Sequence, residues 1–189
     1  MIKKLAIVVL PLFLFVFCEI GYAQDMEIGG VKFPGEKLVA GKTLKLNGVA
    51  LKKAALVIKI YAGGFYLETP TKDAQEAIES EQVKRMHLHY LTDKGTVKRI
   101  QEGFIDMMEK CNPPELVKAH GADIEKYASW LDKKTVPGKT SVTTYVPGVG
   151  LTVEYQGEVK GTIPGKEFAQ MYFRYVLGDK KMKKGYLGK

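Results

Sequence analysis

The sequence predicts an α+β fold, an open-faced β-sandwich in which helices are layered on one face of an antiparallel sheet. Three observations indicate it. Strand-like segments with period-two alternation come first, two consecutive amphipathic helices follow them, and a β-hairpin with one last helix ends the domain. Strands and helices grouped in this way favour antiparallel pairing, whereas regular alternation of the two would favour a parallel sheet.

The chain begins with the pattern of a signal peptide, residues 1–23. Lys3 and Lys4 precede an apolar run at residues 5–17 that is too short to span a bilayer as a helix. Small residues follow this run, so we expect cleavage near Ala23 and a periplasmic or secreted protein. A membrane anchor is the alternative interpretation.

The segment left after cleavage is long enough for one hydrophobic core. We expect one domain at residues 24–179 and a solvated, basic C-terminal tail at residues 180–189. The formal charge falls only from +8 to +7 on cleavage, because Lys3, Lys4 and Glu19 are removed. An exported basic protein meets anionic envelope surfaces more readily than nucleic acid. We therefore expect no nucleic-acid partner and a weak contact of the tail with such a surface.

The most informative segment is LNGVALKKAALVIKIYAGGFYL, at residues 46–67. Asn47-Gly48 is a strong hairpin-turn signal, and the residue types that follow fit a long strand. Successive side chains of a strand point to opposite faces, so a cation and a phenol of this segment point the same way. One face holds Lys53, Lys59 and Tyr61, and the other, which we expect to pack on the core, holds Leu56, Ile58 and Ile60.

The remaining elements follow in a mixed order. Cys111 ends the apolar stripe of one predicted helix, and cleavage removes the only other cysteine, so we expect a buried thiol and no intramolecular disulfide. A reactive or dimer-forming thiol is the alternative. The predicted helices lie at residues 72–80, 96–111, from about 121, and at 166–177; the predicted strands lie at 83–91, 140–146 and 151–155, the last two joined as a hairpin.

The common catalytic motifs are absent from the sequence, including G-x-S-x-G, the P-loop, H-E-x-x-H and paired C-x-x-C. Arg85, His87 and His89 share one face of a predicted strand and form the best candidate for a metal site. A third histidine ligand would have to be His120, the only other histidine. We expect a polar sheet face there, with no metal and no cofactor.

The residues themselves favour a site for an apolar acid between the sheet and its helices. A charged head group is costly to bury unless a cation and a hydrogen-bond donor meet it, and Lys53 and Tyr61 supply both from one strand face. For the side chains that would contact the body of the ligand, ordinary core packing is the first interpretation, because helical stripes of Met and aromatic residues are usually buried, and lining of the site is the second. These side chains are Met107, Met108, Tyr172 and Val176.

The order of the motifs resembles the chalcone isomerase-like superfamily, in its short exported bacterial branch. The resemblance covers nearly the whole chain after residue 23 and implies the open-faced β-sandwich of the chalcone isomerase type. It is carried by GGVKFP at residues 29–34, by the run Lys59, Tyr61, Ala62, Gly64, Tyr66 and Leu67, by EGFIDMMEKCN at 102–112, by GADIEKYASWLD at 121–132, and by the segment 140–179.

Plant chalcone isomerases use an arginine that stabilises a phenolate, with hydroxyls from a threonine and a tyrosine. By resemblance, the arginine position falls on Lys52 or on Lys53, and strand alternation favours Lys53 unless the strand carries a bulge. The threonine position falls on Tyr61, as in related fatty-acid-binding proteins, and the tyrosine position falls near His120. A lysine lacks the planar fork of arginine, which makes true chalcone isomerisation doubtful.

The resemblance therefore implies a non-catalytic binder of a small hydrophobic carboxylic acid, such as a fatty acid. The first alternative is an isomerase, an intramolecular lyase acting on an enone-type substrate, with His120 as acid or base and Lys53 as the oxyanion partner. The second alternative is an envelope scaffold or interaction domain, whose cavity would be filled by its own side chains.

Overall fold

A computed structural model describes residues 24–55 and 57–188 of the chain. The predicted signal peptide and its cleavage site lie outside the described residues. In the described part, no helix combines the length and the apolar character needed to cross a membrane.

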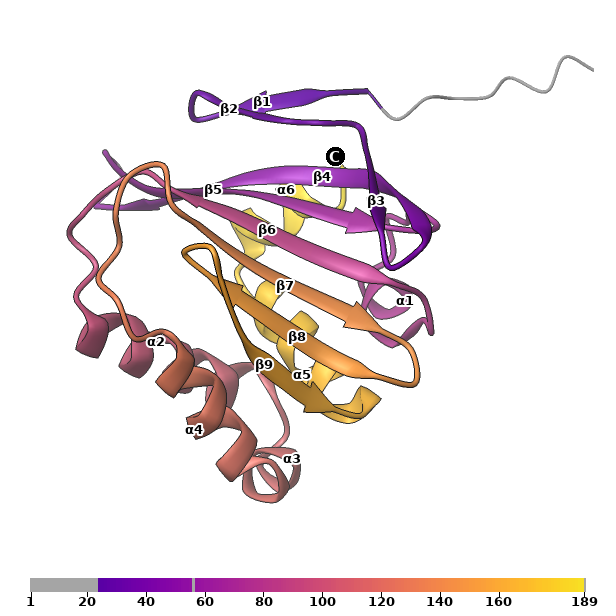
Figure 1. Ribbon diagram of the computed structural model, residues 1–189, viewed down its shortest axis with the longest axis vertical. Helices are drawn as coiled ribbons and strands as arrows, with labels where there is room; N and C mark the ends of the chain where they lie inside the picture. The colour runs from indigo at the N-terminus through magenta and orange to yellow at the C-terminus, as the bar shows by residue number, and fades with distance from the viewer. Residues whose placement is uncertain (1–23, 56, 189) are drawn as a thin grey trace, which may run out of the picture.

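Seven antiparallel strands form the main sheet, and each pairs with its neighbours in sequence (Figure 1). A separate two-stranded hairpin precedes this sheet. The predicted α+β fold is confirmed. The main strands are β3 (Glu36–Val39), β4 (Lys42–Ala54), β5 (Ile58–Leu67), β6 (Lys84–Tyr90), β7 (Thr140–Val146), β8 (Gly150–Tyr155) and β9 (Glu158–Pro164), and the hairpin consists of β1 (Met26–Ile28) and β2 (Val31–Phe33).

The helices gather on one face of the curled sheet, where α5 and α6 pass behind the strands in Figure 1 and α2 and α4 pack beside α5. The β1–β2 hairpin covers part of the opposite face through Phe33. Each long helix begins within a residue or two of its predicted start, as do β7 and β8. The helices are α1 (Ala74–Glu79), α2 (Val97–Cys111), α3 (Pro114–Ala119), α4 (Gly121–Trp130), α5 (Lys166–Val176) and α6 (Lys180–Tyr186).

The hairpin turn predicted at Asn47-Gly48 is wrong. Both residues lie inside β4, next to a register shift, and the chain reverses instead between the end of β4 at Ala54 and the start of β5 at Ile58. The Asn47 side chain donates to the Tyr186 carbonyl oxygen at 2.7 Å. A Cβ atom at Gly48 would clash with the carbonyl oxygen of Gly185. These two residues therefore serve the docking of α6 on β4, which a local turn signal cannot reveal.

The solvated C-terminal tail is also a wrong expectation. Residues 180–186 form α6, whose N-cap is Asp179. Met182 and Tyr186 are buried against the sheet and the other helices, at 3% and 2% exposure. Apolar burial on this scale holds the segment in the domain despite its four exposed lysines. Cys111 is half-buried rather than fully buried, and burial raises the pKa of its thiol.

Candidate ligand-binding site

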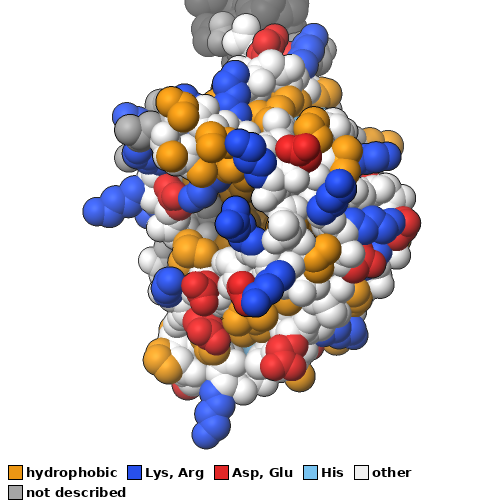
Figure 2. All heavy atoms as spheres, turned by 90° about the vertical axis from the view of Figure 1, so that its left-hand side faces the viewer, with side chains coloured by type: hydrophobic (Ala, Val, Ile, Leu, Met, Phe, Trp, Pro, Cys, Tyr) orange, Lys and Arg blue, Asp and Glu red, His pale blue; other side chains and the backbone are white. Residues whose placement is uncertain are grey.

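A cavity of about 450 Å³ lies between the inner face of the sheet and the helices. Most of its walls are apolar or aromatic, and a small number of polar groups lie among them, which is the usual composition of a small-molecule site. Figure 2 shows a hollow on this side of the molecule, with basic side chains around it and apolar side chains inside it. The apolar and aromatic walls include Ile58, Ile60, Met86, Leu88, Ile100, Phe104, Tyr127, Leu131, Tyr175, Met182 and Tyr186.

Small residues leave room for this cavity. Ser141 lies on β7 beneath the helices, in register with Leu88 of β6. On α2, Arg99, Gly103 and Met107 are spaced four residues apart, and all three line the cavity. A Cβ atom at Gly103 would meet nothing within 4 Å, so α2 leaves the cavity open at this point.

A bulge decides which lysine lies beside Tyr61. Lys52 is paired directly with Tyr61, and the register shifts between Lys52 and Lys53, where Ile60 is the extra residue of β5. The preference for Lys53 from simple alternation is therefore wrong. Lys53 is exposed and lies at the edge of the cavity, opposite Lys59.

The same bulge overturns the predicted division of this strand into a core face and a site face. Ile58, Ile60 and Tyr61 all line the cavity, although two of them had been assigned to the opposite face. Leu56 lies outside the described residues. An extra residue in one strand shifts the alternation by one, so residues on both sides of the bulge can face the same way.

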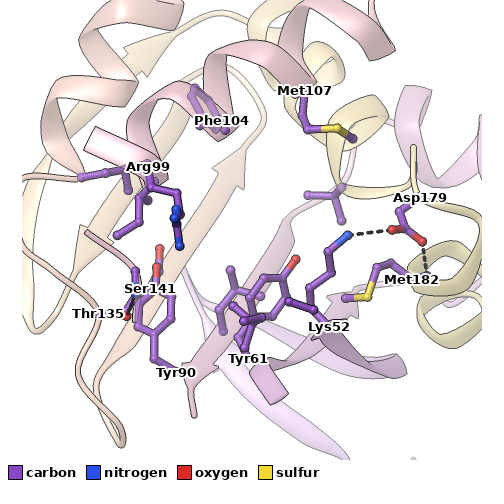
Figure 3. Close-up of a pocket in the computed structure, with 18 of the residues that line it drawn as sticks. Lys52, Tyr61, Tyr90, Arg99, Phe104, Met107, Thr135, Ser141, Asp179 and Met182 are labelled. Atoms are coloured by element: carbon purple, nitrogen blue, oxygen red, sulfur yellow. Dashed lines mark hydrogen bonds and ion pairs between the residues drawn. The ribbon is translucent and has the colours of Figure 1, made fainter. Parts of the chain in front are cut away.

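Tyr61 contributes a neutral hydrogen-bond donor to the cavity. Burial raises the pKa of its hydroxyl well above the ordinary value, which keeps the phenol protonated at neutral pH. In Figure 3 the hydroxyl is turned into the cavity and is joined by no dashed line to the other residues drawn. It is available to a ligand.

Lys52 and Asp179 form an ion pair at the edge of the cavity. Their Nζ and Oδ2 atoms are 2.7 Å apart, and both side chains are partly exposed. The hydrogen bond from Lys52 lowers the pKa of the Asp179 carboxyl. Asp179 also caps α6, because its Oδ1 atom accepts from the backbone N–H groups of Lys181 and Met182.

Of the other side chains predicted to contact the ligand, three line the cavity and one does not. Met107, Tyr172 and Val176 line the cavity. Met108, by contrast, is fully buried and lies in the hydrophobic core away from the cavity lining, so ordinary core packing describes it.

His120 lies outside the cavity lining, between α3 and α4. Its Nδ1 atom is 3.0 Å from Asp123 and its Nε2 atom is 2.8 Å from Glu167. Burial opposes the charged form, but the hydrogen bonds to the two carboxylates raise the pKa of His120. The imidazole therefore joins α4 to α5, and its predicted place in the site is wrong.

Arg85, His87 and His89 lie on the sheet face opposite the cavity. His87 Nδ1 is 2.7 Å from the Nζ atom of Lys37, and Phe33 packs edge-on against both histidine rings. Burial, followed by the charge of Lys37, lowers the pKa of His87 to about 3. Among the residues that the structure describes, no three His, Cys, Asp or Glu side chains gather as metal ligands.

Sequence reasoning missed several polar residues of the cavity. Arg99 on α2 and Lys94 before it were overlooked, because basic residues at the start of an amphipathic helix resemble an ordinary solvated face. Gly103 was the available signal, since glycine in the middle of a helix costs about 1 kcal/mol relative to alanine and needs a reason. The other missed polar residues are Tyr90, Thr92, Thr135, Ser141 and Asp179.

Comparison with known proteins agrees with this architecture. A family model described as chalcone isomerase-like matches residues 25–188. Among solved structures, a fatty-acid binding protein of Arabidopsis thaliana is similar, with a TM-score of 0.69, 17% sequence identity, and coverage of 86% of this chain and 93% of that chain. At this identity the similarity shows the fold alone. No curated protein matches the chain in sequence.

Proposed function

The chain belongs to the chalcone isomerase-like family, and we propose that it is an exported, non-catalytic protein that binds a small hydrophobic carboxylic acid in its cavity. The observation that carries the proposal is an apolar cavity of about 450 Å³ with a basic rim and a free phenol inside. This volume lies within the range of about 300 to 1,000 Å³ that is usual for small-molecule sites.

The charges at the cavity favour an acidic ligand. Lys52, Lys53, Lys94 and Arg99 all line it, and Asp179 is the one carboxylate among the described lining residues. An excess of cations at the entrance of an apolar site raises the local concentration of anionic ligands and compensates a buried head group. The similar Arabidopsis protein is a fatty-acid binding protein, which supports a ligand of this class.

The isomerase alternative loses the acid or base that was assigned to it, because His120 is bound to Asp123 and Glu167 outside the cavity. Tyr61 and Tyr90 do line the cavity, but burial raises the pKa of both hydroxyls well above 10, so neither is a base at neutral pH. The scaffold alternative requires a cavity filled by its own side chains, and this cavity is open.

Export to the periplasm or the cell exterior is part of the proposal. It is supported by the basic start, the short apolar run and the small residues before residue 24. A protein in that compartment meets hydrophobic acids from the envelope or the surroundings.

The test is native mass spectrometry of the mature protein purified from the exported fraction, followed by denaturing extraction of anything bound. The purified protein is then titrated with dodecanoic acid by calorimetry. We expect a bound hydrophobic acid or saturable binding of the added one. A protein that carries no acid and does not bind dodecanoic acid would overturn the proposal.

A further inference from the structure

Of the four cations among the described residues that line the cavity, Lys52 is already paired with a protein carboxylate and Arg99 is not. Lys52 on β4 and Arg99 on α2 lie on either side of the Tyr61 phenol in the view of Figure 3. Either could in principle meet the head group of an acid. The proposed function leaves this choice open, and the surroundings of the two side chains decide it.

Lys52 is already paired with a carboxylate of the protein. Its ammonium group is 2.7 Å from the Asp179 carboxylate. Asp179 cannot turn away easily, because the other oxygen of the same carboxylate holds the first N–H groups of α6. An anionic head group at Lys52 would lie within a few ångströms of this second negative charge. It would have to displace Asp179 or accept the repulsion.

Arg99 has no such partner. Within the described part of the chain it makes no ion pair, and in Figure 3 no dashed line joins it to another residue. Its guanidinium group points from α2 toward Ser141 and Tyr90. These two side chains are nearly buried, at 5% and 6% exposure, and each carries a hydroxyl group.

We infer that Arg99, and not Lys52, is the ion partner of the ligand's carboxylate, with the hydroxyl groups of Tyr61 and Ser141 as neutral donors. The inference rests on the proposed function. A guanidinium group presents a planar fork that binds both oxygens of a carboxylate, and at the rim it stays hydrated until the ligand arrives. The head group thus lies on the α2 side of the entrance, and the apolar body extends toward Phe104, Tyr172 and Tyr186.

The experiment compares the affinities of two probes, dodecanoic acid and dodecan-1-ol, for the wild type and three variants by calorimetry. Arg99→Gln should weaken acid binding at least tenfold and leave alcohol binding within twofold. Lys52→Met should weaken acid binding by threefold or less. Lys98→Gln removes a neighbouring charge of α2 that does not line the cavity and serves as the matched control, with no change expected.

The outcomes separate the inference from the proposed function. Acid binding that survives Arg99→Gln, or that falls more in Lys52→Met than in Arg99→Gln, would overturn the inference while the binding function stands. A wild type that binds neither probe would overturn both. Equal losses of acid and alcohol binding in Arg99→Gln would show that the guanidinium shapes the cavity rather than pairing with the charge, which also refutes the inference.

Discussion

Replacement of Gly103 by tryptophan should abolish most ligand binding while it stabilises the protein. Gly103 lies between Arg99 and Met107 on the stripe of α2 that faces the cavity, and a side chain there has open space around its Cβ atom. An indole at this position would lie across the entrance. Because glycine is a poor helix former, the control Gly103→Ala should raise the free energy of unfolding by about 1 kcal/mol. Gly103→Trp should raise it by about 0.5 kcal/mol from helix propensity and by up to about 2.5 kcal/mol more from burial of the indole.

The loss of affinity follows from the surface that the indole covers. A tryptophan buries about 150 to 250 Å² in a core, and we take about 100 Å² for one that lies in the entrance. At about 25 cal/mol per Å², a ligand that displaces the indole loses about 2.5 kcal/mol. This corresponds to a loss of affinity between tenfold and about a hundredfold.

The assay is calorimetric titration of the mature wild type, Gly103→Trp and Gly103→Ala with dodecanoic acid, together with thermal unfolding of each. The alanine variant should bind like the wild type and melt about 2 to 4 °C higher. The tryptophan variant should be at least as stable as the wild type, so misfolding cannot explain lost binding. Undiminished binding by a folded Gly103→Trp protein would refute the assignment of the ligand to this cavity.

Three further changes test the electrostatics. Asp179→Asn keeps an N-cap for α6 but frees Lys52, so acid affinity should rise several-fold, and calorimetry showing a fall would contradict the pairing described above. Burial lowers the pKa of Lys84 to about 8, so the unfolded chain holds this proton over a pH range in which the folded protein has lost it. As the pH rises from about 8 to about 10.5, the free energy of unfolding of the wild type should therefore increase by up to about 3 kcal/mol relative to Lys84→Met. Urea unfolding that shows no such increase would refute the shift. The pKa of His120 is raised, so the stabilisation that its charged form gives the folded protein is present below about pH 6.5 and lost at higher pH. His120→Ala should therefore lower the midpoint of urea unfolding more at pH 5.5 than at pH 8, and it should leave acid binding unchanged.

The elements that the sequence predicted well are those whose pattern is local and long. The apolar stripe of α2, the start of α4 at Gly121 and the hairpin of β7 and β8 depend on side chains a few positions apart. The α+β class followed from their order. The two-residue turn signal at Asn47-Gly48 gave a wrong prediction because the glycine is required by a tertiary contact, the close approach of Gly185, and not by a local turn.

The candidate site was predicted in part, and its errors have two physical causes. Tyr61, Met107, Tyr172 and Val176 line the cavity as expected, since strand and helix periods place them on the inner side. The prediction that Lys53 lies beside Tyr61 was wrong because a bulge depends on pairing between strands, and one extra residue moves the following side chains to the other face. The prediction that His120 belongs to the site was wrong because the resemblance gave only its position in the sequence and not the two carboxylates that bind it outside the cavity.

The docking of α6 explains why the lysine beside Tyr61 does not remain free for a ligand. Gly48 and Gly185 let α6 approach β4 closely, and the Tyr186 side chain then fills the space over Gly63 at the end of the cavity. This docking brings the start of α6, and therefore its cap Asp179, to the edge where Lys52 emerges from β4. One carboxylate thus caps a helix and neutralises a cation. In the proposed site, the acid would therefore be recognised from α2, where Arg99 lies across the cavity from that pair and forms no ion pair among the described residues.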